Sequence, residues 1–303
     1  MLERAAGLPE RALQAIAELE RRVIAADGGR LKLDWGTLRG RTGDRVEDLL
    51  WWKNDRLLGF LGLFSFGSAV ELSGMVDPAA RRRGIATALL NTAAQVWHER
   101  GAERVLLIVP RSSAAGRHLA LARGGTLDHA EHALVLSHRP AGEGRDDTLG
   151  VRRASDGRND ALSVRRATTA DVPVVARLLE LGFGEPATEV ADLLKSPRHG
   201  TLVIELSGSP VGTMRVTRDG DDAAIYAFAI DPARQGRGIG RDALRRVCQQ
   251  LLDDGAAQVR LEVAVENDRA LRLYTSLGFV RVATEDYYAL KGGRSAVEPG
   301  ILG

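Results

Sequence analysis

The chain has 303 residues, of which 44% are hydrophobic and 27% are charged, with 42 basic and 40 acidic side chains. These values are typical of a globular protein long enough for two domains. The single cysteine, Cys248, excludes an internal disulfide and a cysteine-based metal cluster. We see no apolar run long enough for a membrane span, no leader segment and no long basic block, so we expect a cytoplasmic protein that binds neither membrane nor nucleic acid.

The first half of the chain alternates between helical and strand patterns. Apolar residues recur at helical spacing in 9–26, and no strand is predicted before that helix. Residues 30–48 are polar and have no clear pattern. The later elements are predicted as a hairpin of 49–52 with 57–64, a strand at 69–76, a helix at 85–100, a strand at 104–109, a helix at 117–122 and a strand at 133–136.

The second half repeats this order after a segment of different character. Residues 137–163 are rich in Gly, Arg and Asp and lack apolar periodicity, which is typical of a linker. The first strand begins near Val164, with 149–153 as an alternative, and Thr168 or Thr169 caps the helix 171–181. The predicted elements that follow are a hairpin of 201–206 with 211–216, a strand at 223–230, a helix ending at 253, a strand at 259–265, a helix at 268–277 and a strand at 287–290.

A glycine-rich loop stands between a strand and a helix in each half. The second copy is Gln235-Gly-Arg-Gly-Ile-Gly240, and the first is Arg81-Arg-Arg-Gly-Ile-Ala86. Glycines without side chains let backbone N–H groups close around an anion at the start of a helix, which suits a diphosphate.

The two loops belong to a long internal repeat. Positions 154 residues apart correspond, from Asp77 and Asp231 through Gly124 and Gly278, without an insertion. One glycine loop is weak evidence, but a constant offset over about sixty residues indicates a duplicated unit. We therefore predict an N-terminal domain at 1–140, a linker at 141–162, a C-terminal domain at 163–291 and a loose tail at 292–303.

Each half resembles the Gcn5-related N-acetyltransferases, whose loop signature is Gln/Arg-x-x-Gly-x-Gly/Ala. The second half adds Leu261-Glu-Val-Ala-Val-Glu-Asn267 and Leu273-Tyr-Thr-Ser-Leu-Gly-Phe279, which is similar to the ribosomal-protein alanine N-acetyltransferases. The tandem layout resembles mycothiol synthase. The resemblance implies an α/β fold, with a mixed α+β sheet in each of two tandem domains, and acetyl-CoA as co-substrate.

The resemblance also implies where acetyl-CoA is bound. The diphosphate would take backbone N–H groups of the loop, the pantetheine arm would pair with the preceding strand, and a bulge in that strand would aim an N–H near Phe228 at the thioester oxygen. The expected binding residues are Phe228, Ala229, Ile230, Gln235, Gly236, Arg237, Gly238, Ile239, Gly240, Arg241, Asn267 and Tyr274, with Met75, Val76, Arg81, Arg82, Arg83, Gly84, Ile85 and Ala86 in the first copy.

Two proton transfers need side chains, and the resemblance implies Glu262 as the base and Tyr274 as the acid. A carboxylate can take the proton of the amine, and a phenol can give one to the leaving thiolate. Glu266 is the competing base, and Asn267 would anchor the loop or the CoA chain. Mycothiol synthase has a Glu in the strand before the loop, where this chain has Ala223 or Ala224.

The first copy has lost these groups. The 154-residue offset puts Ile108 at the position of Glu262, Ser113 at that of Asn267 and Ala120 at that of Tyr274. Glu71 is the only nearby acid on the preceding strand. We expect this domain to keep the loop and to lack the chemistry.

The sequence thus predicts acetyl transfer from acetyl-CoA to a primary amine of a small molecule or a peptide, by direct attack in the C-terminal domain. Acetylation of a cysteinyl amine, as in mycothiol synthase, is an alternative, and a non-catalytic acyl-CoA sensor is another. The six histidines lack metal-ligand spacing, so we expect no metal. A monomer and a homodimer are both compatible with the sequence.

Overall fold

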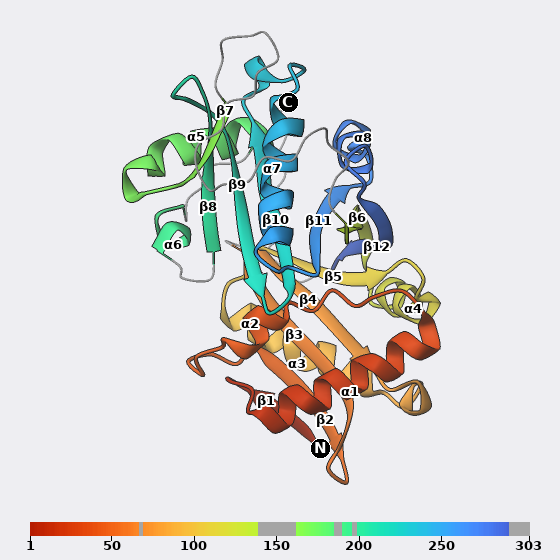
Figure 1. Cartoon of the computed structure of the whole chain (residues 1–303). Helices are drawn as coiled ribbons and strands as arrows, with labels where there is room; N and C mark the ends of the chain where they lie inside the picture. The colour runs from red at the N-terminus through yellow and green to blue at the C-terminus, as the bar shows by residue number, and fades with distance from the viewer. Residues whose placement is uncertain (67–68, 139–161, 185–189, 196–198, 291–303) are drawn as a thin grey trace, which may run out of the picture. The chain divides into compact units, whose positions relative to one another are not determined.

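The computed structural model describes residues 1–66, 69–138, 162–184, 190–195 and 199–290 (Figure 1). The chain forms two compact units. The first contains Met1–His132 together with Val282–Gly303, and the second contains Ala133–Arg281. No helix in the described ranges is long and apolar enough to cross a membrane.

The first unit is built on a mixed sheet in the order β1-β2-β3-β4-β5-β12. Only β4 and β5 pair in parallel, and the other neighbours are antiparallel. Its strands are β1 (Leu2–Ala5), β2 (Asp48–Lys53), β3 (Arg56–Phe66), β4 (Ala69–Val76), β5 (Arg104–Pro110) and β12 (Val280–Ala289). Its helices are α1 (Glu10–Asp27), α2 (Trp35–Arg39), the 3₁₀ turn η1 (Pro78–Ala80), α3 (Ile85–Glu99) and α4 (Ala114–Ala122).

The second unit has the same plan, with strands in the order β11-β10-β9-β8-β7. Its strands are β7 (Leu162–Arg166), β8 (His199–Leu206), β9 (Ser209–Asp219), β10 (Asp222–Ile230) and β11 (Gln258–Ala264). Its helices are η2 (Thr169–Asp171), α5 (Val172–Phe183), α6 (Val190–Lys195), η3 (Pro232–Arg234), α7 (Ile239–Asp253) and α8 (Asp268–Thr275). The strand β6 (Thr126–Leu136) enters this unit at Ala133.

Helices cover both faces of each sheet, because the inner strands send apolar side chains to both faces. In the first unit, α1 packs Ile16 and Leu19 against Phe60, while α3 packs Leu89 against Leu72 on the other face. In the second unit, α7 contacts β7, β10 and β11, and its apolar face is buried with the strands. A smaller cluster around Val175 lies under α5 and α6.

The prediction that no strand precedes the first helix is wrong. The segment Leu2–Ala5 pairs antiparallel with β2 and forms the edge of the sheet. The sequence of this strand has no apolar pattern that would indicate it, since Glu3 and Arg4 are exposed and only Ala5 is buried. Backbone pairing, rather than an apolar pattern, makes this strand, and charged side chains are common on such edges. The segment 149–153, the alternative first strand of the second half, lies outside the described residues.

Other elements differ from the prediction mainly in extent. Both closing strands, β6 and β12, begin earlier than predicted. The first three residues of each are exposed, so these strand ends bury no apolar face. The unpatterned stretch after α1 contains α2, which Asp34 caps by accepting a hydrogen bond from the N–H of Thr37. The short helix α6 was not predicted. The predicted tail and all of the predicted linker except Leu162 lie outside the described residues.

Candidate active site

The strand β10 carries a bulge next to the end of its pairing with β9. Tyr226 pairs with Arg215 and Ala229 pairs with Thr213, so two residues of β10 stand against one of β9. Ala227 takes a φ of 50°, a left-handed conformation that costs a side-chain-bearing residue about 1 kcal/mol or more. The bulge frees the backbone around Phe228 from the sheet, as the sequence comparison with the family implies.

The neighbouring strands β10 and β11 pair only over their first residues. Their parallel register runs from Asp222 with Gln258 to Ile225 with Leu261 and stops there, although both strands continue. Residues beyond this point, including the bulge on β10 and Glu262 on β11, therefore have backbone groups that this pairing does not use. Such an interruption in a parallel sheet is a place where a substrate chain can pair.

The glycine-rich loop of the second unit leads from β10 into α7. Gly236 and Gly238 have φ values of 78° and 80°, and a Cβ on either would meet nothing within 4 Å. Gly238 is also the N-cap of α7, so the first N–H groups of the helix begin here. The loop residues 232–238 are exposed. An open, glycine-lined helix start fits a diphosphate in charge and in space.

Side chains hold this loop in place. Asp231 accepts a hydrogen bond from the N–H of Ala233 at 2.9 Å. The amide of Gln235 donates to the carbonyl of Ile230 at 3.0 Å and accepts from Arg269 at 2.8 Å. Gln235 is thus a structural tie between strand, loop and α8.

The two predicted proton-transfer residues come from different elements. Glu262 lies on β11, half-buried, on the face opposite the buried Leu261 and Val263. Tyr274 lies on α8 and is buried in the core cluster of the second unit, with its ring centre 6.0 Å from that of Phe279. Burial raises the pKa of Tyr274 to about 12, because the phenolate would lose its hydration.

Asn267 begins α8. Its side-chain oxygen accepts a hydrogen bond from the N–H of Ala270 at 3.0 Å, as an N-cap does. The competitor Glu266 is exposed on the turn before it.

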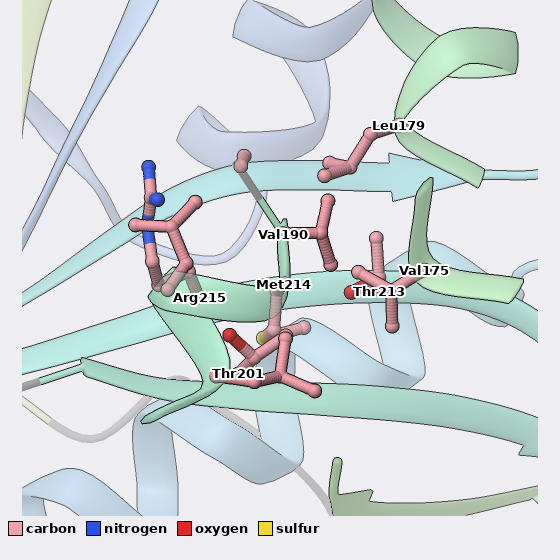
Figure 2. A pocket seen from close by; sticks show the side chains of 10 residues that line it. Val175, Leu179, Val190, Thr201, Thr213, Met214 and Arg215 are labelled. Carbon is pink, nitrogen blue, oxygen red and sulfur yellow. The ribbon is translucent and has the colours of Figure 1, made fainter. Parts of the chain in front are cut away.

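The face of the second sheet that lies under α5 and α6 contains a pocket (Figure 2). Ala227 of the bulge lines it, together with Thr213, Met214 and Arg215 of β9. Its remaining walls are apolar side chains of the helices and Thr201 of β8. The sequence predicted neither this pocket nor the role of Arg215 in its lining, because neither the position of the bulge nor α6 is indicated by a sequence pattern.

The first unit retains the loop but differs at each chemical position. Its strand β4 pairs with β3 in unbroken register from Val76 to Ala69, with no bulge. Ile108 and Ala120, at the positions of Glu262 and Tyr274, are buried in apolar clusters. Ser113 keeps the capping role of Asn267 by accepting a hydrogen bond from the N–H of Gly116.

The arginines of this loop have different surroundings from one another. Arg81 forms two hydrogen bonds of 2.8 Å with the carboxylate of Asp27 and a third with the carbonyl of Val76. Its charge is therefore already paired, whereas Arg82 and Arg83 are exposed. Arg82 has a φ of 61° where the second unit has Gly236. Met75 and Val76, at the end of β4, contribute to the cores on the two sheet faces.

Comparisons with known proteins agree with this geometry. The sequence profile of the acetyltransferase (GNAT) family matches residues 16–124 and 174–279, more than half of the chain. The chain therefore belongs to this family, and it is an acetyl-CoA-dependent N-acetyltransferase with two tandem domains of the family fold.

One relative resembles the chain over most of its length and another over about a third of it. The mycothiol acetyltransferase of Kytococcus sedentarius is 30% identical, covering 91% of this chain and 93% of the relative. The N-alpha-acetyltransferase RimI of Mycobacterium tuberculosis is 39% identical, and the match covers 33% of this chain and 64% of the relative. Among solved structures, a GCN5-related N-acetyltransferase from Sphaerobacter thermophilus is 20% identical, with a TM-score of 0.72, covering 93% of this chain and 96% of the other.

Proposed function

We propose that the second unit performs the acetyl transfer and that the first unit does not. The observation that carries this proposal is the difference between the two corresponding strands. The strand β10 has a bulge beside a pocket, with Glu262 on the next strand, whereas β4 is regular and Ile108 replaces the acid. The alternative of a non-catalytic acyl-CoA sensor gives no reason for this difference.

The proposed reaction begins with acetyl-CoA lying along the end of β10. Its diphosphate would take N–H groups at Gly236–Arg241, where the charge of the helix start favours an anion. The acceptor amine would approach from the pocket and lose a proton to Glu262, directly or through water. The amine nitrogen then attacks the thioester carbon, and the N–H near Phe228 stabilises the oxygen that gains negative charge.

Collapse of this intermediate breaks the carbon–sulfur bond and expels the CoA thiolate. Tyr274 would donate a hydrogen bond and then a proton to that sulfur, and the extra proton that the attacking nitrogen still carries would leave to water, which gives the neutral amide. With a pKa of about 12, Tyr274 stays protonated at every pH below about 10, so the donor is always present. Asn267 and Gln235 would hold the turn and the loop that surround the CoA chain.

The first prediction tests the proton-transfer residues. Tyr274→Phe should lower kcat by roughly 10²–10⁴, the range for loss of general acid help, with nearly unchanged affinity for acetyl-CoA. Glu262→Gln should also lower kcat, while Glu266→Gln serves as the matched control and should retain activity. Release of free CoA thiol in the presence of an amine panel measures each variant. Wild-type turnover by both Tyr274→Phe and Glu262→Gln would contradict these roles.

The second prediction compares the two loops. Gly84 and Gly238 have the same φ of 80° and both have open space at the Cβ position, so a substitution causes the same backbone strain in each. Gly238→Asp should abolish acetyl transfer, because its carboxylate would stand where the diphosphate binds. Gly84→Asp should leave kcat within a few-fold of wild type. Gly238→Asn, of the same size and without charge, should retain more activity than Gly238→Asp. An equal loss of activity in both Asp variants would refute the proposal that the first unit does not perform the reaction.

A second candidate concerns the acceptor. Two of the relatives named mycothiol acetyltransferase match more than nine-tenths of the chain, which supports a cysteinyl amine as the acceptor that is acetylated. Cysteinamide included in the amine panel tests this candidate directly: its acetylation in preference to other amines would support a cysteinyl amine as the acceptor, and its acetylation no faster than the other amines would refute it.

A further inference from the structure

The pocket under α5 and α6, from which we propose that the acceptor approaches, is lined by a cation that the proposed reaction does not use. Arg215 lies on β9 and its side chain lines the pocket (Figure 2), to which Ala227 of the bulge also contributes. The other lining residues are apolar, apart from the hydroxyls of Thr201 and Thr213. The hydroxyl of Thr213 already donates to the carbonyl of Leu202. Arg215 is thus the charged group that a molecule in this pocket would meet.

The guanidinium of Arg215 differs from those of two other arginines of this unit in having no carboxylate partner among the described residues. Arg165 and Arg246 lie 2.8 and 3.0 Å from carboxylates. By contrast, the Nε of Arg215 is buried without a hydrogen-bond partner in the described ranges, and the lining of the pocket includes no acid. The guanidinium carbon lies 5.9 Å from the centre of the Tyr226 ring. Burial lowers the pKa of Arg215, because its charge is partly removed from water.

Strand register relates Arg215 to the proposed base. Arg215 pairs with Tyr226, and Glu262 follows directly after the pair of Ile225 with Leu261. Because side chains alternate along a strand, Arg215, Tyr226 and Glu262 lie on the same face of three neighbouring strands. Neighbouring strands are about 4.8 Å apart, so the backbones of Arg215 and Glu262 are separated by roughly 10 Å or more.

We propose that Arg215 recognises a carboxylate of the acceptor, and that the natural acceptor is a small amine that also carries a carboxylate. Its amine would face Glu262 and the bulge, and its carboxylate would face the guanidinium, which matches carboxylate geometry with two parallel N–H donors. This inference rests on the proposed function of the second unit. It also makes a prediction against the neutral cysteinyl amide, whose carboxyl group is already in an amide bond.

The kinetic test uses pairs of amines that differ only at this group: β-alanine with β-alaninamide, and L-cysteine with L-cysteinamide. Since an amide also changes the basicity of the amine, the useful quantity is the ratio of wild type to variant for each amine. Arg215→Gln should lower kcat/KM for the acids by roughly 10–100-fold, mainly through KM, the range for loss of a charged hydrogen bond. The same variant should change the amides less than threefold and leave the KM of acetyl-CoA unchanged.

Two further variants control for charge and folding. Arg218→Gln removes an exposed arginine from the same strand and should leave every ratio near one. Arg215→Lys keeps the charge and should retain part of the preference for acids. Equal loss for acids and amides in Arg215→Gln would show that Arg215 only supports the fold through Tyr226, and it would overturn the proposal.

A binding measurement separates this inference from the proposed reaction. Calorimetric titration of the full chain with β-alanine, in the presence of CoA, should detect binding to wild type and its loss in Arg215→Gln. Binding without turnover of any amine would refute the proposed reaction and support the carboxylate site. If β-alanine fails to bind wild type, or binds the variant equally well, the carboxylate site is refuted whatever the turnover.

Discussion

Asp48 illustrates how burial can outweigh a neighbouring charge. The carboxyl is fully buried on β2, with Nε of Arg41 at 3.2 Å from one oxygen. Neither oxygen of Asp48 has a hydrogen bond of good geometry in the described part of the chain. Arg41 lowers the pKa of Asp48, but desolvation raises it more, from its ordinary value of 3.8 to about 7. At neutral pH this group is therefore near its point of titration.

The sign of the resulting pH dependence follows from this rise in pKa. Below pH 3.8 both the folded and the unfolded chain hold the proton of Asp48. Between about 4 and 7 only the folded chain holds it, so the stability of the first unit should fall as pH rises through this window. Asp48→Asn should flatten this dependence in urea unfolding at pH 5 and pH 8, and the exposed Asp55→Asn should not. A wild-type slope in Asp48→Asn would contradict the assignment.

Single residues differ in how far the sequence reveals them. Asn267 and Ser113 could be expected at turns, and both begin helices. The roles of Glu262 and Tyr274 stay predictions. Arg215 is one of many arginines, and only the pocket around it makes it distinctive. Ala227 could not be recognised as a left-handed residue, because alanine at a positive φ is set by the strands that flank it rather than by local preference.

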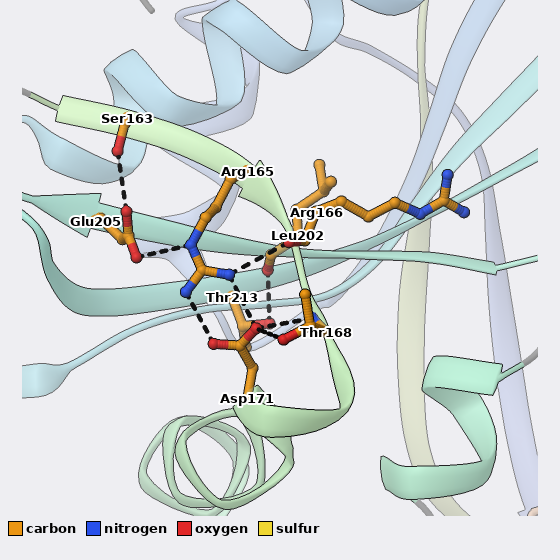
Figure 3. A network of polar contacts seen from close by, with 8 residues as sticks. All are labelled: Ser163, Arg165, Arg166, Thr168, Asp171, Leu202, Glu205 and Thr213. Atoms are coloured by element: carbon orange, nitrogen blue, oxygen red, sulfur yellow. Dashed lines mark hydrogen bonds and ion pairs between the residues drawn. The ribbon is translucent and has the colours of Figure 1, made fainter.

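At the scale of elements, one polar network fixes the start of α5 against the edge of the sheet (Figure 3). Arg165 of β7 forms two hydrogen bonds of 2.8 Å with Asp171 and one with Glu205 of β8. Asp171 and Thr168 also form a capping box. Arg165 and the hydrogen bonds from Thr168 hold the pKa of Asp171 well below its ordinary value. Since α5 forms a wall of the pocket, this network also positions the acceptor side.

Loss of this carboxylate should weaken the second unit. Asp171→Asn should lower the free energy of unfolding by about 1–3 kcal/mol at pH 7, the range for a cap and a charged hydrogen bond. The ionised Asp171 contributes fully above pH 3.8, and its contribution is lost gradually as pH falls from 3.8 through its low folded-state pKa, so the difference between the two proteins should be smaller at pH 3 than at pH 7. Circular dichroism in urea at pH 7 and pH 3 measures this. The exposed Asp192→Asn is the control, and a similar loss in that variant would argue against the network.

Elements with an apolar period were predictable, and edges were not. The hairpin of β2 and β3 and both glycine-loop helices follow the sequence pattern, because each buries a periodic apolar face. The turn at Asn54 and Asp55 has the positive φ values that a tight hairpin needs. The strand β1 depends on pairing with a segment more than forty residues away, so no local pattern could indicate it.

At the scale of the whole molecule, the compact units do not follow the order of the repeats. The end of the second repeat, from Val282, belongs to the first unit, where β12 pairs with β5 and buries Tyr287 and Tyr288. The end of the first repeat, from Ala133, belongs to the second unit, where Leu134 and Leu136 join the core. The predicted boundaries 1–140 and 163–291 follow chain order instead, so the two descriptions make different predictions for the same substitutions.

Leu134 and Tyr288 occupy corresponding positions in the two repeats, 154 residues apart. Substituting each of them tests whether the stable units are the compact units or the repeats in chain order. All four tryptophans, Trp35, Trp51, Trp52 and Trp97, lie in the first unit, so their fluorescence during urea unfolding reports on that unit. Tyr288→Ala leaves a cavity beside β5 and should destabilise the first unit by about 3–5 kcal/mol, as large-to-small aromatic core substitutions do.

Leu134→Ala should shift the tryptophan transition much less, because its cavity forms in the core of the second unit. Val282→Ala, at a half-exposed position of the same strand β12, is the control for a change on that strand. If domains followed chain order, the result would be reversed. Leu134→Ala would then lower the tryptophan midpoint, and Tyr288→Ala would leave it near wild type.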